Sequence, residues 1–214
     1  DQGDTKQAEH YFSEAIRLRE ELANNNPERY NPDLAMSYNN AGVFYDDQGD
    51  TKQAEHYYFE AIRIREELAN NNPERYNPDL AMSYNNAGNF YKNQGGTKQA
   101  EHYYFEAIRL CEELANNNPE RYNPNLAMSY NNAGVFYDDQ GDAKQAEHYY
   151  FEAIRIREEL ANNNPERYNP DLATSYYNYG IFKNDKNYFD KALNLAKTQP
   201  DNPYCRQIIS ALEN

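Results

Sequence analysis

The sequence predicts an all-α solenoid, in which helix–turn–helix units stack one after another, and two observations carry this prediction. The stretch that begins at Pro32 returns nearly unchanged at Pro78 and Pro124, and a partial copy begins at Pro170, so the units repeat every 46 residues. A fixed period of this size is the signature of a stacked repeat protein. Inside each unit, apolar residues recur three and four positions apart between capping residues, as amphipathic helices require.

The chain carries a formal net charge of −14 and has two cysteines among its 214 residues. This acidity argues against nucleic acid as a partner, because a phosphate backbone needs a basic surface, and it favours a basic protein or peptide. The apolar runs are far shorter than the roughly 20 residues that span a bilayer, so we expect no membrane segment. Cys111 and Cys205 lack metal or redox spacing, which predicts reduced thiols and a cytoplasmic location.

Residues 1–31 are predicted to form the second helix of a unit whose first helix is missing. Asp4 is placed to cap a helix that starts at Thr5, and apolar residues follow near one face of that helix. Since the chain starts in mid-unit, we expect it to come from a longer array. The apolar stripe of this helix is then either exposed or paired with another chain, which would give a homodimer through the unpaired N-terminal helix.

The first helix of each complete unit is bounded by recognisable caps. In the first unit, Asn31 and Pro32 are predicted to cap and open a helix that runs to about Gln48. Gly49 ends this helix, because glycine tolerates the left-handed conformation of a C-terminal cap, and Asp50 caps the next helix. The three complete units span residues 32–77, 78–123 and 124–169.

The second helix of each unit starts after this cap and carries a stripe of small and aromatic residues, which in the first unit are Ala54, Tyr58 and Ala61. The polar stretch NNNPERYN, residues 70–77, is predicted to form a turn because its proline cannot continue the helix. After the complete units we expect a degenerate last repeat and a C-terminal capping helix that begins at Pro203 and ends near Leu212. These two segments span residues 170–199 and 200–214.

A spacing of small and aromatic residues recurs around four glycines. Gly42 is followed by Tyr45 three residues later, by Ala54 twelve residues later, and then by Tyr58 and Ala61. This spacing resembles the tetratricopeptide repeat, and the resemblance implies a right-handed solenoid. The stretches Asn39-Asn40-Ala41-Gly42 and Tyr45-Asp46-Asp47-Gln48-Gly49 are similar to the long-repeat, kinesin light chain-like variety. The period is 46 rather than 34 residues, and we place the extra residues in a longer second helix and the NNNPERYN turn.

The resemblance also implies a concave groove, lined by the first helices, that holds a peptide or helix of a partner protein. The asparagines Asn40, Asn86, Asn132 and Asn178 would form a ladder along it, since an amide both donates to and accepts from a peptide backbone. The alternative is that these amides bond only each other or water. By position relative to each glycine, the groove residues are Met36 with its equivalents, Asn39, Asn40, Val43, Asp46, Asp47, Asn85, Asn86, Asn89, Lys92, Asn131, Asn132, Val135, Asp138, Asp139 and Asn178.

Differences between the units fall mainly in this groove. The units from Pro32 and Pro78 differ at six positions, of which four lie within residues 43–50 of the first unit. We infer, as a hypothesis, an acidic groove at Asp46, Asp47, Asp138 and Asp139 that is interrupted by Lys92 and Asn93.

The sequence shows no arrangement of residues typical of catalysis: it has no nucleophile elbow, no phosphate-binding glycine loop and no paired acid and base. We therefore expect a non-catalytic protein–protein interaction scaffold that needs neither a cofactor nor a metal ion. Two alternatives stay open. One is structural self-assembly through exposed ends of the solenoid, and the other is a regulatory or sensory segment of a larger protein.

Overall fold

The fold is a succession of α-helices, and a computed structural model describes it for residues 2–213, with side chains described from residue 6 onward. Over these residues the chain forms ten α-helices and no strand, which confirms the predicted all-α repeat fold. The helices are α1 Gln2–Asn25, α2 Pro27–Asp47, α3 Thr51–Asn71, α4 Pro73–Asn93, α5 Thr97–Asn117, α6 Pro119–Asp139, α7 Ala143–Asn163, α8 Pro165–Lys183, α9 Lys186–Ala196 and α10 Pro203–Glu213.

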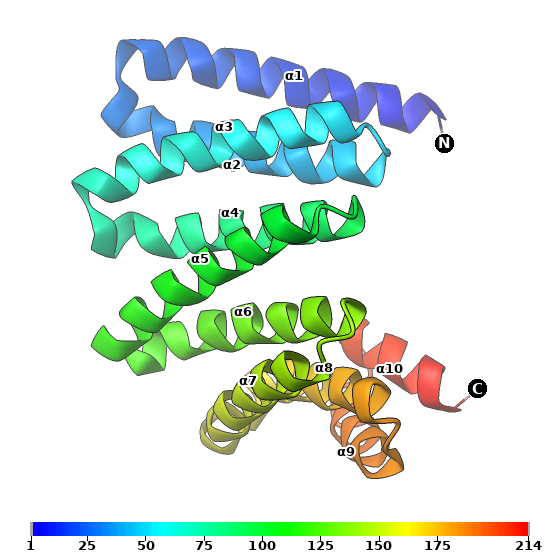
Figure 1. The fold of residues 1–214 in the computed structure, drawn as a ribbon. Helices are drawn as coiled ribbons and strands as arrows, with labels where there is room; N and C mark the ends of the chain where they lie inside the picture. Colours follow the sequence, from blue (N-terminus) through cyan, green and yellow to red (C-terminus); the bar gives the residue numbers. More distant parts are fainter. Residues whose placement is uncertain (1, 214) are drawn as a thin grey trace. The chain divides into compact units, whose positions relative to one another are not determined.

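The helices group into two compact units, Asp1–Leu110 and Cys111–Asn214. In the first unit α1, α2, α3 and α4 pack in chain order, as the blue to green part of Figure 1 shows, and α2 also touches α4. In the second unit α6 to α10 pack in the same sequential way, and α6 also touches α8. We call α2, α4, α6 and α8 the A helices, and α1, α3, α5, α7 and α9 the B helices.

The A helices begin earlier than predicted, and the NNNPERYN turn was wrong. Helix α4 starts at Pro73, and the side chain of Asn72 accepts a hydrogen bond from the Arg75 N–H at 3.2 Å. Pro78, expected at the first helical position, lies inside the helix. Both Asn-Pro pairs carry the capping signature, and the helix uses the earlier one, after which Tyr76 is buried. The extra residues of the long period therefore lengthen both helices of a unit, each to 21 residues in α3 and α4.

The predicted cap at Asp4 is also wrong, because α1 begins at Gln2. The predicted turn at Gly49 and Asp50 is present. Gly49 has φ of 75°, and the bonds from Gly49 N to Asp46 O and from Asp50 N to Tyr45 O are both 2.9 Å, a Schellman turn. The side chain of Asp50 then accepts from the N–H of Gln53. This turn reverses the chain between two helices.

A glycine on each A helix lies against an aromatic ring of the next B helix. An ideal Cβ built on Gly42 would lie 2.8 Å from the Tyr58 ring, and Gly88 and Gly134 stand in the same relation to Tyr104 and Tyr150. Only a residue without a Cβ fits there, so the A and B helices can approach closely. The alanines that flank each ring are consequently buried: Ala54, Ala61, Ala100, Ala107, Ala146 and Ala153.

Hydrogen bonds at a second set of recurring positions join each B helix to the following A helix. The Tyr84 hydroxyl donates to Glu66 at 2.7 Å, and the same pair recurs at Tyr38, Tyr130 and Tyr176. The buried Arg65 donates to Ser83 Oγ at 2.5 Å and to the Asp79 carbonyl at 2.9 Å. Cys111 replaces this arginine in one repeat, and its Sγ lies 3.6 Å from Ser129 Oγ. These bonds fix the register between successive repeats.

Replacement of Gly42 by Ala tests the glycine–tyrosine contact. Alanine in place of an exposed helical glycine would stabilise by about 1 kcal/mol. At Gly42 the new methyl overlaps the Tyr58 ring, so we expect the free energy of unfolding to fall by about 1–3 kcal/mol in urea denaturation. An unchanged or raised stability would mean that the two helices do not pack this closely.

Buried tyrosines should also make the fold sensitive to alkali. Burial, together with the hydrogen bond to Glu66, raises the pKa of Tyr84, and burial raises the pKa of Tyr179 to about 12. Unfolded tyrosine ionises near pH 10, so the unfolded state loses its protons first. The stabilisation is complete below about pH 10 and falls by about 1.4 kcal/mol per pH unit for each buried tyrosine above it.

We therefore expect tyrosinate absorbance and loss of helical circular dichroism to appear together in one cooperative step above about pH 10. Gradual ionisation of most tyrosines with the helices intact would contradict this.

Candidate binding face on the A helices

One side of each A helix presents a continuous stripe of solvent-accessible side chains. On α2 the stripe is Met36, Asn40, Val43 and Asp47, spaced by four, three and four residues, so that they share one helix face. We call these residues, together with their counterparts on the neighbouring A helix, the A face. In the first unit the counterparts on α4 are Met82, Asn86, Asn89 and Asn93. In the second unit the A face comprises Met128, Asn132, Val135 and Asp139 on α6, and Thr174, Asn178 and Ile181 on α8.

The predicted groove residues Asn39, Asn85 and Asn131 do not lie on this stripe, because all three are buried. Two of them orient the amide on the next A helix: Asn39 Oδ1 accepts from Asn86 Nδ2 at 3.0 Å, and Asn131 Oδ1 accepts from Asn178 Nδ2 at 3.3 Å. In both pairs the partner of the ladder amide is a buried neighbour outside the ladder, Asn39 or Asn131, rather than another ladder amide. Each bond uses one N–H of the outer amide, which retains further capacity to donate and accept.

Acidic residues flank the stripe near the C-terminal ends of α2 and α6. Asp46 and Asp138 are half-buried, and Asp47 and Asp139 are exposed. Burial, followed by repulsion from Asp47, raises the pKa of Asp46, and the same two causes raise the pKa of Asp138. A cation placed beside either pair would lower the cost of keeping both carboxylates ionised.

The corresponding part of α4 differs in charge and in contacts. Lys92, which is half-buried, stands where α2 has Asp46. Asn89 stands where α2 has Val43, and its Oδ1 accepts a hydrogen bond from the Tyr104 hydroxyl at 2.6 Å. Asn89 therefore has a structural role as well as a position on the A face. The apolar Ile181 of α8 was not singled out from the sequence, although its position after Asn178 matches that of Val43 after Asn40.

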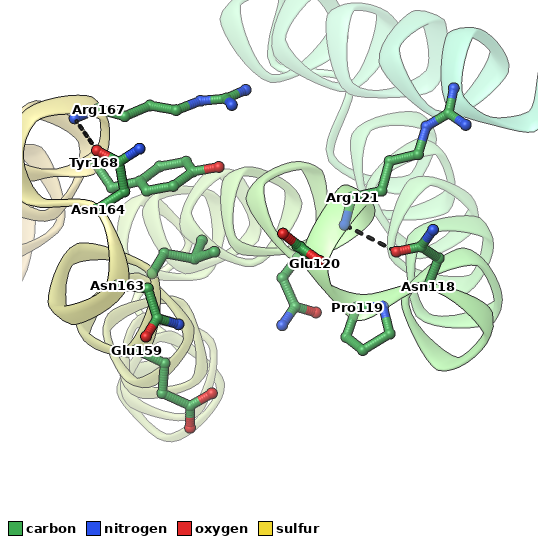
Figure 2. A pocket seen from close by; sticks show the side chains of 11 residues that line it. Asn118, Pro119, Glu120, Arg121, Glu159, Asn163, Asn164, Arg167 and Tyr168 are labelled. Atoms are coloured by element: carbon green, nitrogen blue, oxygen red, sulfur yellow. Dashed lines mark hydrogen bonds between the residues drawn. The ribbon is translucent and has the colours of Figure 1, made fainter.

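A hollow of about 860 Å³ lies in the second unit at the N-terminal ends of α6 and α8, shown in Figure 2. Arg121 and Arg167 border it, each with its guanidinium about 5.1 Å from the ring of the following tyrosine. The backbone N–H groups of Arg121 and Arg167 already donate to the side-chain oxygens of the helix-capping residues Asn118 and Asn164. Because the walls are open and the caps are satisfied, we assign no ligand to this hollow.

Within the described part of the chain, no group of three or more His, Cys, Asp or Glu side chains is placed to hold a metal ion. None of the helices described is long and apolar enough to cross a membrane. Cys111 and Cys205 are both free thiols and both buried.

Two family models for the tetratricopeptide repeat match the sequence, one over residues 79–159 and the other over residues 34–74. The chain belongs to the tetratricopeptide repeat family. Proteins of this family generally mediate protein–protein interactions, and their fold is typically non-catalytic. A comparison with curated protein sequences found no significant match.

Several solved structures resemble this tetratricopeptide repeat chain. BtubC (BKLC) from P. vanneervenii has a TM-score of 0.67 and 25% identity, over 100% of this chain and 76% of BtubC. The nearly identical TPR-like repeats of a Podosopora anserina protein described as a putative kinesin light chain have a TM-score of 0.58 and 18% identity, over 92% of this chain and 96% of that one. A thermophilic TPR protein of Thermus thermophilus has a TM-score of 0.53 and 17% identity, over 99% and 96%. The similarity to kinesin light chain-like repeats is thus confirmed.

Replacement of Asn39 by Ala tests whether the buried amides orient the A face. The change removes the acceptor of the Asn86 amide, so we expect a loss of about 1–2 kcal/mol in unfolding free energy. The NMR signal of the Asn86 side-chain NH2 should also lose its protection from hydrogen exchange. Asn40→Ala is the matched control, because this neighbour is exposed and its loss should change stability by less than about 0.5 kcal/mol. Equal effects of the two substitutions would contradict the assigned roles.

Proposed function

We propose that this chain is a non-catalytic scaffold that binds a peptide or helix of a partner protein along the A face. The observation that carries the proposal is the composition of this face. Exposed Met36 and Val43 flank Asn40 on α2, and Met82 stands beside Asn86 on α4. Apolar side chains that would otherwise stay in water alternate with amides, so that a ligand could bury the first and hydrogen-bond the second.

Preorganisation supports the same function. The bond from Asn86 to the buried Asn39 holds one amide of the face in a fixed orientation before a ligand arrives. A ligand that meets fixed groups loses less conformational entropy on binding than one that must order them. The pair Asn178 and Asn131 gives the second unit the same feature.

Charge supports a basic ligand. The raised pKa of Asp46, caused first by burial and then by Asp47, means that a lysine or arginine of the ligand would relieve an unfavourable charge. Lys92 on the neighbouring helix would face an acidic or polar residue of the same ligand. The net charge of −14 also favours association with a basic partner. Location in the cytoplasm, expected from the two reduced thiols, belongs to this proposal.

Selection of displayed random peptides on the purified chain tests the proposal, with the affinity of each selected peptide then measured by titration. We expect the double substitution Asn40→Tyr and Asn86→Tyr to lower affinity at least tenfold, because both side chains lie on the A face. Lys52→Ala is the control, since Lys52 is exposed on helix α3 rather than on an A helix. Selected peptides that bind the double variant as well as the original chain would place their site elsewhere.

The same peptides test the charge assignment. Asp47→Asn should weaken basic peptides and Lys92→Asp should strengthen them, each by a factor of about 2–10, with both effects shrinking in high salt. Circular dichroism of each variant confirms that the helices remain. Selected peptides without an excess of Lys and Arg, or affinities that do not respond to these two substitutions, would overturn the basic ligand while leaving the A face intact.

A further inference from the structure

Three B helices carry a phenylalanine that the fold leaves in solvent. Phe59 on α3, Phe105 on α5 and Phe151 on α7 occupy the same place in their repeats, and 58%, 59% and 59% of their surfaces are exposed. Their counterparts are Ser13 on α1 and, on α9, Asp190, which follows the ring that packs on the glycine of α8. Because two B helices pack with a polar residue at this position, packing does not require the phenylalanine.

The surroundings of Phe59 are acidic. Glu55, four residues earlier, and Glu66, seven residues later, share its side of helix α3. Glu55 accepts a hydrogen bond from the Tyr91 hydroxyl at 2.8 Å, and Glu66 accepts one from the Tyr84 hydroxyl at 2.7 Å. Both carboxylates therefore face the following repeat, and the groups that bond them are neutral hydroxyls, which do not cancel their charge.

A row of tyrosine rings joins the two places where these glutamates bond. Tyr103 stacks on Tyr91 with the ring centroids 5.6 Å apart, and its centroid lies 5.8 Å from that of Tyr84. Burial, followed by the negative charges of Glu66 and Glu55, raises the pKa of Tyr103, which is half-buried. Aromatic rings beside negative charge form an environment that attracts ammonium and guanidinium groups.

The other charged side chains of α3 do not neutralise this surface. Arg63 pairs with Glu60 at 2.9 Å and with Glu67 at 2.8 Å, so these three groups together keep one negative charge. Lys52, seven residues before Phe59, adds one positive charge, and the two contributions cancel. The two glutamates that flank Phe59 stay unbalanced. A basic partner is favoured over a second copy of this chain, whose net charge is −14.

The last repeat contains an internal example of what such a surface binds. Glu147 on α7, the counterpart of the first of the two glutamates, pairs with Lys183 at 2.6 Å. The ammonium of Lys191 lies 5.1 Å and 5.0 Å from the ring centroids of Tyr176 and Tyr188, a pair of rings in the same place in their repeat. Lysines of the chain itself thus contact both the glutamate and the rings there.

We propose that the surface around Phe59 binds a segment of a partner protein that carries apolar residues between two lysines. The apolar residues would cover Phe59, and the two ammonium groups would pair with the flanking glutamates, as Lys183 does in the last repeat. We call this surface the B face, and its residues are Glu55, Phe59, Glu66, Tyr84, Tyr91 and Tyr103. It shares no residue with the A face, so the two proposals can fail separately.

The two glutamates also set the spacing of the lysines. They lie eleven residues apart on one helix, which corresponds to about 16.5 Å. An extended peptide covers the same distance in about five residues. The probe is therefore the peptide Gly-Lys-Ser-Leu-Phe-Ser-Lys-Gly, labelled with a fluorophore and titrated with the chain while anisotropy is recorded.

We expect saturable binding of this peptide. Replacement of both of its lysines by glutamine should weaken binding at least tenfold, because the ammonium groups are lost. Replacement of its Leu-Phe pair by Ser-Ser should weaken binding by a similar factor, because nothing then covers the phenylalanine. Both control peptides are titrated with the unaltered chain, so these comparisons do not depend on the folding of any variant.

A variant of the chain provides the reciprocal test. The triple substitution Phe59→Ser, Phe105→Ser and Phe151→Ser gives all three helices the residue that α1 carries at Ser13. It should lower peptide affinity at least tenfold and leave the helical circular dichroism unchanged, because the replaced rings are exposed. The double asparagine-to-tyrosine variant of the A face is the control, and it should bind the peptide as the original chain does.

Four results would overturn the proposal. Two are the absence of saturable binding and equal affinity for the lysine and glutamine peptides. The third is binding that the A-face variant abolishes and the triple serine variant retains, which would place the peptide on the A face. The fourth is a dimer, detected by sedimentation at the titration concentrations, that the triple serine substitution dissociates. That result would show that a second copy of the chain covers the phenylalanines.

Discussion

The close contact between an A-helix glycine and the aromatic ring of the following B helix is the constraint on which the other features depend. At Gly42 there is no room for a Cβ beside Tyr58, so the two helix backbones approach until the flanking Ala54 and Ala61 are fully buried. With that distance fixed, the remaining side chains of the A helix have only one side left that faces solvent. The A face is the side of each A helix that the glycine contact leaves exposed to solvent.

Hydrogen bonds between repeats then set the register of neighbouring helices, which the glycine contact alone does not determine. Apolar packing is not directional, whereas the Tyr84–Glu66 and Arg65–Ser83 bonds accept only one alignment of neighbouring helices. The hydrogen bond from Asn86 to Asn39 also joins two repeats, but Asn86 itself is partly exposed at the surface. A bond that aligns two repeats therefore also orients a group that a ligand can meet, so stability and binding share one structural feature.

Most of the fold followed from the sequence, and the exceptions have physical reasons. The Gly49–Asp50 turn was correct because a positive φ and a side-chain cap are local properties of those two residues. The start of the A helices was wrong because two Asn-Pro pairs satisfy the same local rule, and the structure uses the earlier one, where Asn72 accepts from the Arg75 N–H. Among the groove residues, spacing from the glycine could not separate Asn39 from Asn40. The two are adjacent, and helix packing buries one and exposes the other.

The sequence by itself determined the repeat, its period, the helical fold and the family, because these are periodic or local features that neighbouring residues specify. The tertiary structure decided which side chains of each helix face water, because that depends on the rotation of one helix against the next. It assigned Asn39 to the interior and Met36 to the surface, and it gave Asn89 a bond to Tyr104 that no local pattern predicts.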